Sequence, residues 1–203
     1  MMPHQKPTRR QVQKEDTRRI IQNTAYTLFA ERGYAETTMR ILADRAGVGL
    51  GTIFKHFPDK PSLLVAAFQE DLARIIHEAF QALPESGIKA QLLHITRNIY
   101  AFYASNLEFS RTLIKETLFL KGEHGKVLDR QLLAFMDAIS ALLKRAVEKG
   151  ELPIETDAYE GALAFGSFYF AGLVMGLKKA VFDVEEQLKV VDVLIDNHFI
   201  KTK

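Results

Sequence analysis

Apolar residues recur every three or four positions along most of this 203-residue chain, which is the spacing that gives an α-helix one apolar face. A sustained alternation of apolar and polar residues, typical of a half-buried strand, does not occur in the sequence. We therefore expect an all-α fold. Beyond the first third of the chain, the apolar stripes predict helices over residues 63–80, 88–106, 109–122, 128–147, 157–179 and 184–200.

The segment 37–57 is predicted to form two short helices joined by a tight turn. Thr37 and Thr38 can cap the first helix, because a hydroxyl accepts a bond from a backbone N–H that lacks a helical partner. Gly47 stands where that helix should end, and glycine takes the left-handed conformation without strain. Val48 follows as an apolar residue that fixes the angle between the two helices.

The second of these helices, over residues 50–57, has one apolar and one polar side. Ile53 and Phe57 point the same way, whereas the other side chains are mostly small, basic or hydrogen-bonding. Such a face suits the major groove of DNA. Asp59, as a carboxylate cap, and Pro61, inside the first turn, predict that a third helix begins here. The pattern predicts a helix-turn-helix DNA reader followed by a connecting helix.

This segment resembles the DNA-binding domain of TetR-type (tetracycline-repressor-like) bacterial transcriptional regulators, over about the first third of the chain. In two places it departs from the family pattern: Gly49 replaces a serine-like cap and Phe54 replaces a tyrosine. Glycine is a cap only about a few tenths of a kcal/mol poorer, whereas phenylalanine lacks the hydroxyl that would bond a phosphate. The residues that carry the resemblance are Phe29, Arg32, Gly33, Tyr34, Thr37, Thr38, Leu42, Ala43, Ala46, Gly47, Val48, Gly51, Thr52, His56, Phe57, Lys60, Leu63 and Leu64.

The resemblance implies which residues contact DNA. Positions that commonly touch phosphates in the family correspond to Thr38, Thr52, Phe54, His56 and Lys60. Those on the groove face correspond to Leu50, Gly51 and Lys55. The predicted DNA-binding set is completed by Arg40 and Gly49.

Charge supports this division of the chain. Residues 1–60 hold 11 Lys and Arg against 6 Asp and Glu, although the whole chain carries a net charge of only +2. A basic head would steer the correct end of the molecule toward DNA. Residues 1–15 are basic and lack apolar periodicity, so we expect a flexible arm, or alternatively an arm that follows phosphates or enters a minor groove. We expect the DNA-binding domain over 16–61 and a helical ligand-binding and dimerisation domain over 62–203.

The helix predicted over 157–179 is apolar on all sides. Seventeen uncharged residues separate Glu160 from Lys178, which is the lower limit for crossing a bilayer. A helix of this kind can instead lie at the centre of a soluble dimer. We expect the dimer, with 128–147 as companion helix and no membrane, and the resemblance implies the same arrangement. The predicted interface residues are Leu132, Phe135, Ile139, Leu142, Gly161, Ala164, Phe168, Gly172 and Met175.

The second domain is rich in aromatic residues, most of which are expected in its core. Some could line a pocket for an apolar or aromatic effector. Glu116 or Arg97 could supply a charged contact, although solvent exposure is the simpler interpretation of each. The candidate effector-binding residues are Phe102, Tyr103, Phe119, Met136, Phe165 and Tyr169.

Other function classes find little support. The six histidines lack metal-ligand spacing, and the sequence contains no phosphate-binding loop and no nucleophile elbow, so we expect no enzyme activity, metal or cofactor. Cysteine is absent and no secretory signal is seen, which favours the cytoplasm. We expect a homodimeric, sequence-specific regulator of a palindromic operator, released by a small molecule; the resemblance suggests repression. The alternative is a helical adaptor that binds DNA or protein without such a ligand.

Overall fold

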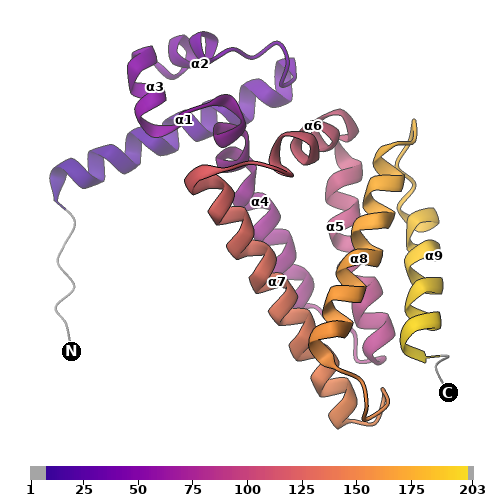
Figure 1. Cartoon of the computed structure of the whole chain (residues 1–203). Helices are drawn as coiled ribbons and strands as arrows, with labels where there is room; N and C mark the ends of the chain where they lie inside the picture. The colour runs from indigo at the N-terminus through magenta and orange to yellow at the C-terminus, as the bar shows by residue number, and fades with distance from the viewer. Residues whose placement is uncertain (1–7, 201–203) are drawn as a thin grey trace. The chain divides into compact units, whose positions relative to one another are not determined.

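The computed structural model describes residues 8–200, and within that range the chain is helical and forms no strand (Figure 1). This confirms the expected all-α fold. A π-helical turn, Asp196–Ile200, continues the last α-helix. The α-helices are α1 (Arg9–Arg32), α2 (Met39–Ala46), α3 (Leu50–His56), α4 (Lys60–Gln81), α5 (Ile88–Ser105), α6 (Leu107–Thr117), α7 (Gly122–Glu148), α8 (Ala158–Leu177) and α9 (Val184–Ile195).

The chain folds into two compact units. The first, which we call the head, comprises Met1–Gln69 and Thr112–Leu120; the second, which we call the body, comprises Glu70–Arg111 and Lys121–Lys203. Helices α4 and α6 therefore each contribute residues to both units. The DNA-binding domain predicted from the sequence ends at residue 61, whereas the head also includes the first turns of α4 and the last turns of α6.

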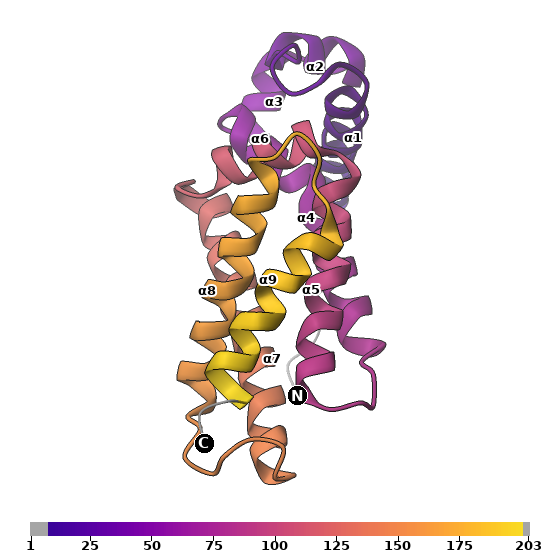
Figure 2. The ribbon, with the colours of Figure 1, turned by 90° about the vertical axis from the view of Figure 1, so that its right-hand side faces the viewer.

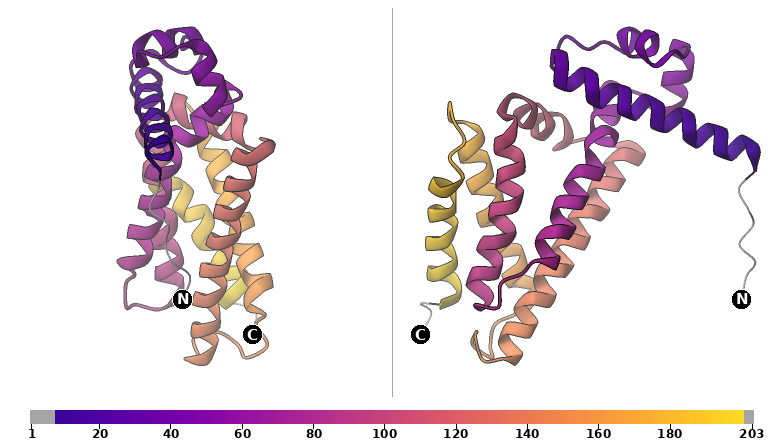
Figure 3. Two further views of the ribbon diagram at one scale, coloured as in Figure 1. Left: turned by 90° about the vertical axis from the view of Figure 1, so that its left-hand side faces the viewer. Right: turned by 180° about the vertical axis from the view of Figure 1, so that it is seen from behind.

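Helix α1 begins earlier than the sequence analysis expects. Residues 9–15, predicted to belong to a flexible arm, form its first two turns, which extend past α2 and α3 (Figure 3). The reason is a reciprocal cap at Thr8, whose backbone N–H donates to the Gln11 side chain at 2.7 Å while its hydroxyl accepts from the Gln11 N–H at 3.3 Å. Residues 1–7 of the predicted arm lie outside the described residues.

Asp59 caps α4 as predicted. Its carboxylate accepts the backbone N–H of Ser62 at 2.7 Å. The next turns of α4 are buried in the head, where the Gln22 side chain of α1 donates to the Ala66 carbonyl at 3.0 Å. The start of α4 is therefore fixed to the head by both a cap and a tertiary hydrogen bond.

The body is built around α8, which packs against α7 and α9, while α9 also packs against α5 (Figure 2). Glycines let these helices approach closely. A side chain at Gly172 would overlap the Tyr100 hydroxyl of α5 and would lie 3.2 Å from Val191 of α9. That hydroxyl donates to the Tyr169 carbonyl at 2.6 Å, so the tyrosine ring is fixed in place.

Among the described residues, α8 is the one helix long and apolar enough to span a membrane by length and composition, with a mean hydropathy of 1.3. In the structure, 39% of the most apolar 18-residue stretch of α8 is buried. A helix at the centre of a folded domain meets the same criterion, and the inner side of α8 does carry core residues such as Phe165 and Leu173. The apolar sequence of α8 is thus accounted for on its inner side by packing within the body.

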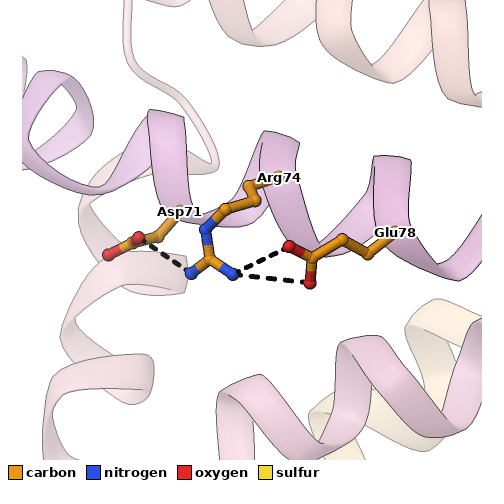
Figure 4. A network of polar contacts seen from close by, with 3 residues as sticks. All are labelled: Asp71, Arg74 and Glu78. Atoms are coloured by element: carbon orange, nitrogen blue, oxygen red, sulfur yellow. Dashed lines mark hydrogen bonds and ion pairs between the residues drawn. The ribbon is translucent and has the colours of Figure 1, made fainter.

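The outer face of α4 carries an ion-pair network (Figure 4). Arg74 donates to Asp71 at 3.1 Å and to Glu78 at 3.2 Å, at the one-turn spacings of a helix surface. Because Arg74 and Glu78 are exposed, water and salt screen these contacts and they contribute little to stability. We interpret this network as a solvated helix face.

Candidate nucleic-acid interface

The turn between α2 and α3 holds α3 in a defined orientation. Gly47 has φ 67° and ψ 30°, the left-handed conformation predicted from the sequence. Its N–H donates to the Asp44 carbonyl at 3.3 Å, and the N–H of Val48 donates to the Ala43 carbonyl at 3.1 Å. These two bonds satisfy carbonyls at the end of α2 that would otherwise lack partners.

The two threonines before α2 have different roles. The hydroxyl of Thr38 accepts the N–H of Ile41 at 3.2 Å and so caps α2. Thr37 is fully buried, and its hydroxyl donates to the Gly33 carbonyl at 2.8 Å. One threonine therefore starts the helix, and the other ties the preceding loop to the end of α1.

Helix α3 is amphipathic in the sense that the sequence predicts. Ile53 is fully buried, and so is Phe57, which follows the last turn. The opposite side is open to solvent: Gly51 and Lys55 are exposed, and the Phe54 side chain is 47% exposed. The exposed side of α3 is therefore open to a binding partner, whereas its buried side packs within the head.

Gly49 precedes α3 and takes the extended conformation of an N-cap, with φ −66° and ψ 146°. The Gly49 carbonyl accepts the N–H of Thr52 at 2.8 Å, although no side chain caps the helix. The glycine thus serves as a cap, as the sequence analysis expects. Of the whole predicted DNA-binding set, the exposed members are Thr38, Arg40, Gly49, Gly51, Phe54 and Lys55, and the half-buried members are Leu50, Thr52, His56 and Lys60.

A basic cluster surrounds the end of α3. Lys55 and His56 come from α3, and Lys14 and Arg18 come from α1. The pKa of His56 is lowered, first by burial and then by the positive charges of Lys14, Arg18 and Lys55. The Arg18 guanidinium lies 5.3 Å from the centre of the Phe57 ring. Lys14 and Arg18 are one turn apart on α1, but the sequence analysis did not select them. The cap that begins α1 was the available signal that they belong to a helix.

Lys60 lies against the surface of the head. Its ammonium group is 4.0 Å from the centre of the Tyr34 ring and donates to the Ala35 carbonyl at 3.4 Å. Burial lowers the pKa of Lys60, and the negative charges of Glu116 and Glu36 act in the opposite direction. The Tyr34 hydroxyl donates to the Glu116 carboxylate at 3.5 Å, so residues of the loop after α1, of α4 and of α6 meet within the head.

Five of the six predicted effector-binding residues lie in the body. Tyr103 and Phe165 are buried, and Phe102, Met136 and Tyr169 are half-buried. The Tyr103 and Tyr169 side chains share a hydrogen bond. Burial raises the pKa of Tyr103 to about 12 and also raises that of Tyr169, so both phenols are neutral near pH 7.

Phe119, the sixth, follows α6 in the part of the chain that belongs to the head, and its side chain is 84% exposed. Phe119 therefore belongs to a different unit from the other five predicted residues. The two candidate charged residues also have partners: Arg97 pairs with Glu185, and Glu116 accepts from Tyr34.

The residues predicted for the dimer interface fall on both sides of α7 and α8. Leu132 and Met175 are exposed, and Ala164 and Phe168 are half-buried. The other five face the interior of their own chain, because α5, α7, α8 and α9 pack there; they are Phe135, Ile139, Leu142, Gly161 and Gly172.

These features define a helix-turn-helix DNA-binding protein with a second, helical unit. The model of the bacterial regulatory proteins of the tetR family matches residues 21–67, from the middle of α1 to the first turns of α4. The chain is 38% identical over 181 residues to the transcriptional repressor KstR of Mycobacterium tuberculosis, covering 88% of this chain and 79% of that one. It is 32% identical over 152 residues to the repressor AcnR of Corynebacterium glutamicum, covering 69% and 73%.

The chain belongs to the tetR family of bacterial transcriptional regulators, and it is a DNA-binding regulator. Among solved structures, its fold is similar to that of Thermus thermophilus FadR, a TetR-family transcriptional repressor solved in complex with lauroyl-CoA. The TM-score is 0.73 at 23% identity, over 92% of this chain and 97% of that one. The family confirms the function class and the fold predicted from the sequence.

Proposed function

We propose that the protein is a homodimeric repressor that places one α3 helix of each subunit in successive major grooves and leaves its operator when an apolar or aromatic effector binds the body. The observation that carries this proposal is the exposed face of α3. It is formed by the uncharged Gly51 and Phe54 and the basic Lys55, opposite the buried Ile53. The basic cluster at its end supplies the charge that phosphates require.

The DNA contacts divide by their chemistry. Leu50, Gly51 and Lys55 are proposed to face base edges, where a side chain changes sequence preference. Thr38, Thr52 and the basic residues at the end of α3 are proposed to face phosphates. We add Lys14 and Arg18 of α1 to this second set, because their charges already act on His56.

The dimer is proposed to form through the outer face of α8. Two large apolar residues, Leu163 and Phe170, are exposed there seven positions apart, which is close to two full turns, so they form a short stripe on one side of the helix. An exposed apolar stripe on one helix favours burial against a second copy. Two heads related by a two-fold axis would meet grooves about 34–36 Å apart, so the operator should be palindromic.

The effector is proposed to bind among the aromatic side chains of the body. Tyr103 and Tyr169 provide neutral phenols beside apolar rings, and Tyr169 lies 6.1 Å from Phe135 between ring centres. Such a lining suits an apolar molecule with a hydrogen-bonding group. A coupling of about 1–3 kcal/mol between effector and operator would be sufficient to change promoter occupancy.

Selection from a random DNA pool with the pure protein tests the first part of this proposal. We expect enrichment of a palindrome, and binding that weakens steeply as salt rises because phosphate contacts release counterions. The Lys55→Ala variant should change which bases are enriched. The Lys126→Ala variant is a matched control, since that lysine is an exposed body residue paired with Glu123 at 2.8 Å. Enrichment of no sequence, or of a site without two-fold symmetry, would contradict the proposal.

Titration of the operator complex tests the effector. Lauroyl-CoA is a reasonable first probe, because the solved repressor with a similar fold carries it. We expect release of the operator by this probe or by a smaller aromatic compound, and reduced release after Tyr103→Phe or Tyr169→Phe. If release occurred but was equal in both tyrosine variants and in the unchanged protein, the proposed binding residues would be wrong.

A further inference from the structure

The Lys60 ammonium group is held at the surface of the head by two direct contacts and by nearby negative charge. The face of the Tyr34 ring lies 4.0 Å away, and the Ala35 carbonyl accepts a hydrogen bond at 3.4 Å. The negative charges of Glu116 and, more weakly, of Glu36 also act on this ammonium group. An aromatic face attracts a cation because its ring quadrupole is negative there. Lys60 is therefore retained by the protein before any DNA is present.

Glu116 acts on this lysine both directly and through Tyr34. Its carboxylate accepts the Tyr34 hydroxyl at 3.5 Å, and its side chain is only 25% exposed. A phenol that donates to a carboxylate gains electron density, and its ring face attracts the ammonium group more strongly. The Lys115 ammonium is 3.7 Å from the same carboxylate, but its side chain is largely in solvent, where the pairing is screened.

A DNA phosphate and the contacts within the head compete for the positive charge of Lys60. An ammonium group that contacts a ring and a carbonyl beside a carboxylate charge offers less positive potential to a phosphate, and moving it outward gives up those interactions. We propose that Glu116 is a positioning residue that weakens operator binding by retaining Lys60 on the Tyr34 ring. The inference rests on the proposed contact of Lys60 with a DNA phosphate.

Helix α6 carries Glu116 in the head and also contributes residues to the body. Its first turns belong to the body, where Arg111 donates to the carbonyls of Leu177 and Lys179 at 2.7 and 2.6 Å. Its last turns, including Glu116, belong to the head. A displacement of α6 along its length would therefore move Glu116 relative to Lys60.

A double-mutant cycle on the selected operator tests the proposal. Dissociation constants are measured by fluorescence anisotropy at low salt for the unchanged protein, Glu116→Gln, Lys60→Ala and the double variant. We expect Glu116→Gln to bind about fivefold more tightly, which corresponds to about 1 kcal/mol. Its salt dependence should be steeper, because more of the lysine charge reaches phosphate. Glu116→Gln should have no effect in the Lys60→Ala background.

Two further variants separate the proposed route from general charge effects. Glu108→Gln removes the same charge from the same helix at a side chain that is 92% exposed, and we expect unchanged affinity. Tyr34→Phe keeps the ring but removes the hydroxyl donor, and we expect a smaller gain than with Glu116→Gln. Equal gains from Glu108→Gln and Glu116→Gln, or a gain that persists without Lys60, would overturn the inference. If the unchanged protein bound no duplex, the proposed function itself would be overturned.

Discussion

Replacing Gly47 by alanine should destabilise the head, whereas the same replacement at Gly51 should not. Gly47 has φ 67°, where a β-carbon crowds the following carbonyl oxygen. No atom lies within 4 Å of the position that the new β-carbon would occupy, so neither steric overlap nor new packing contributes. The whole effect at Gly47 is therefore the cost of a left-handed conformation for an ordinary residue.

The expected change in stability can be taken from the backbone conformation alone, because packing does not contribute at Gly47. A left-handed conformation costs an alanine about 1–2 kcal/mol relative to glycine. At Gly51, which is inside α3 and also has open space around it, alanine should be more stable by up to about 1 kcal/mol because glycine loses more backbone entropy on folding. The two variants differ by the same methyl group, so we expect their stabilities to differ by about 2 kcal/mol.

Hydrogen exchange of the amides in α2 and α3 is the suitable assay, because it reports the head separately from the body. Faster exchange is expected throughout both helices for Gly47→Ala, and slower or unchanged exchange for Gly51→Ala. If the two variants gave equal protection, or if Gly47→Ala were the more protected, the argument from backbone conformation would be refuted.

Four further outcomes are expected. In the free protein, the pKa of His56 is below its ordinary value of 6.5, and nearby phosphates would raise it. Operator affinity should therefore increase as pH falls from about 8 to 6. The His56→Gln variant should lose this increase. The same shift makes the free head less stable below pH 6.5, because the unfolded chain binds the proton more readily. Phe54→Tyr should tighten operator binding by about threefold to tenfold, since a phenol adds one phosphate hydrogen bond. Gly172→Ala should lower the free energy of unfolding of the body by about 1–3 kcal/mol in urea titrations, because its methyl group overlaps the fixed Tyr100 hydroxyl, whereas Gly166→Ala, which meets a flexible methionine, should cost less.

Local signals made the helix-turn-helix predictable. The cap at Thr38, the left-handed Gly47 and the cap at Asp59 each depend on neighbours within five positions, and the structure shows all three. The buried face of α3 follows equally from the spacing of Ile53 and Phe57. These features need no knowledge of the rest of the fold.

Long-range contacts account for what the sequence analysis did not find. Lys14 and Arg18 act on His56 only because α1 is helical from Arg9 and passes the end of α3. The link from Glu116 to Tyr34 joins residues separated by 82 positions. No periodicity in the sequence encodes either contact, since each depends on which helices pack together.

Helix α8 shows why the interface residues could not be sorted from sequence alone. An amphipathic helix reveals its inner face by its polar side, but α8 is apolar all round and carries no such marker. Packing supplies the distinction: Gly161 and Gly172 face inward because Leu143 and Tyr100 occupy the space in front of them. The large residues left outside, Leu163 and Phe170 among them, are the ones that we propose a second copy covers. Replacing both with glutamate should give a monomer whose body remains folded; a dimer that survived this change would place the subunit contact elsewhere.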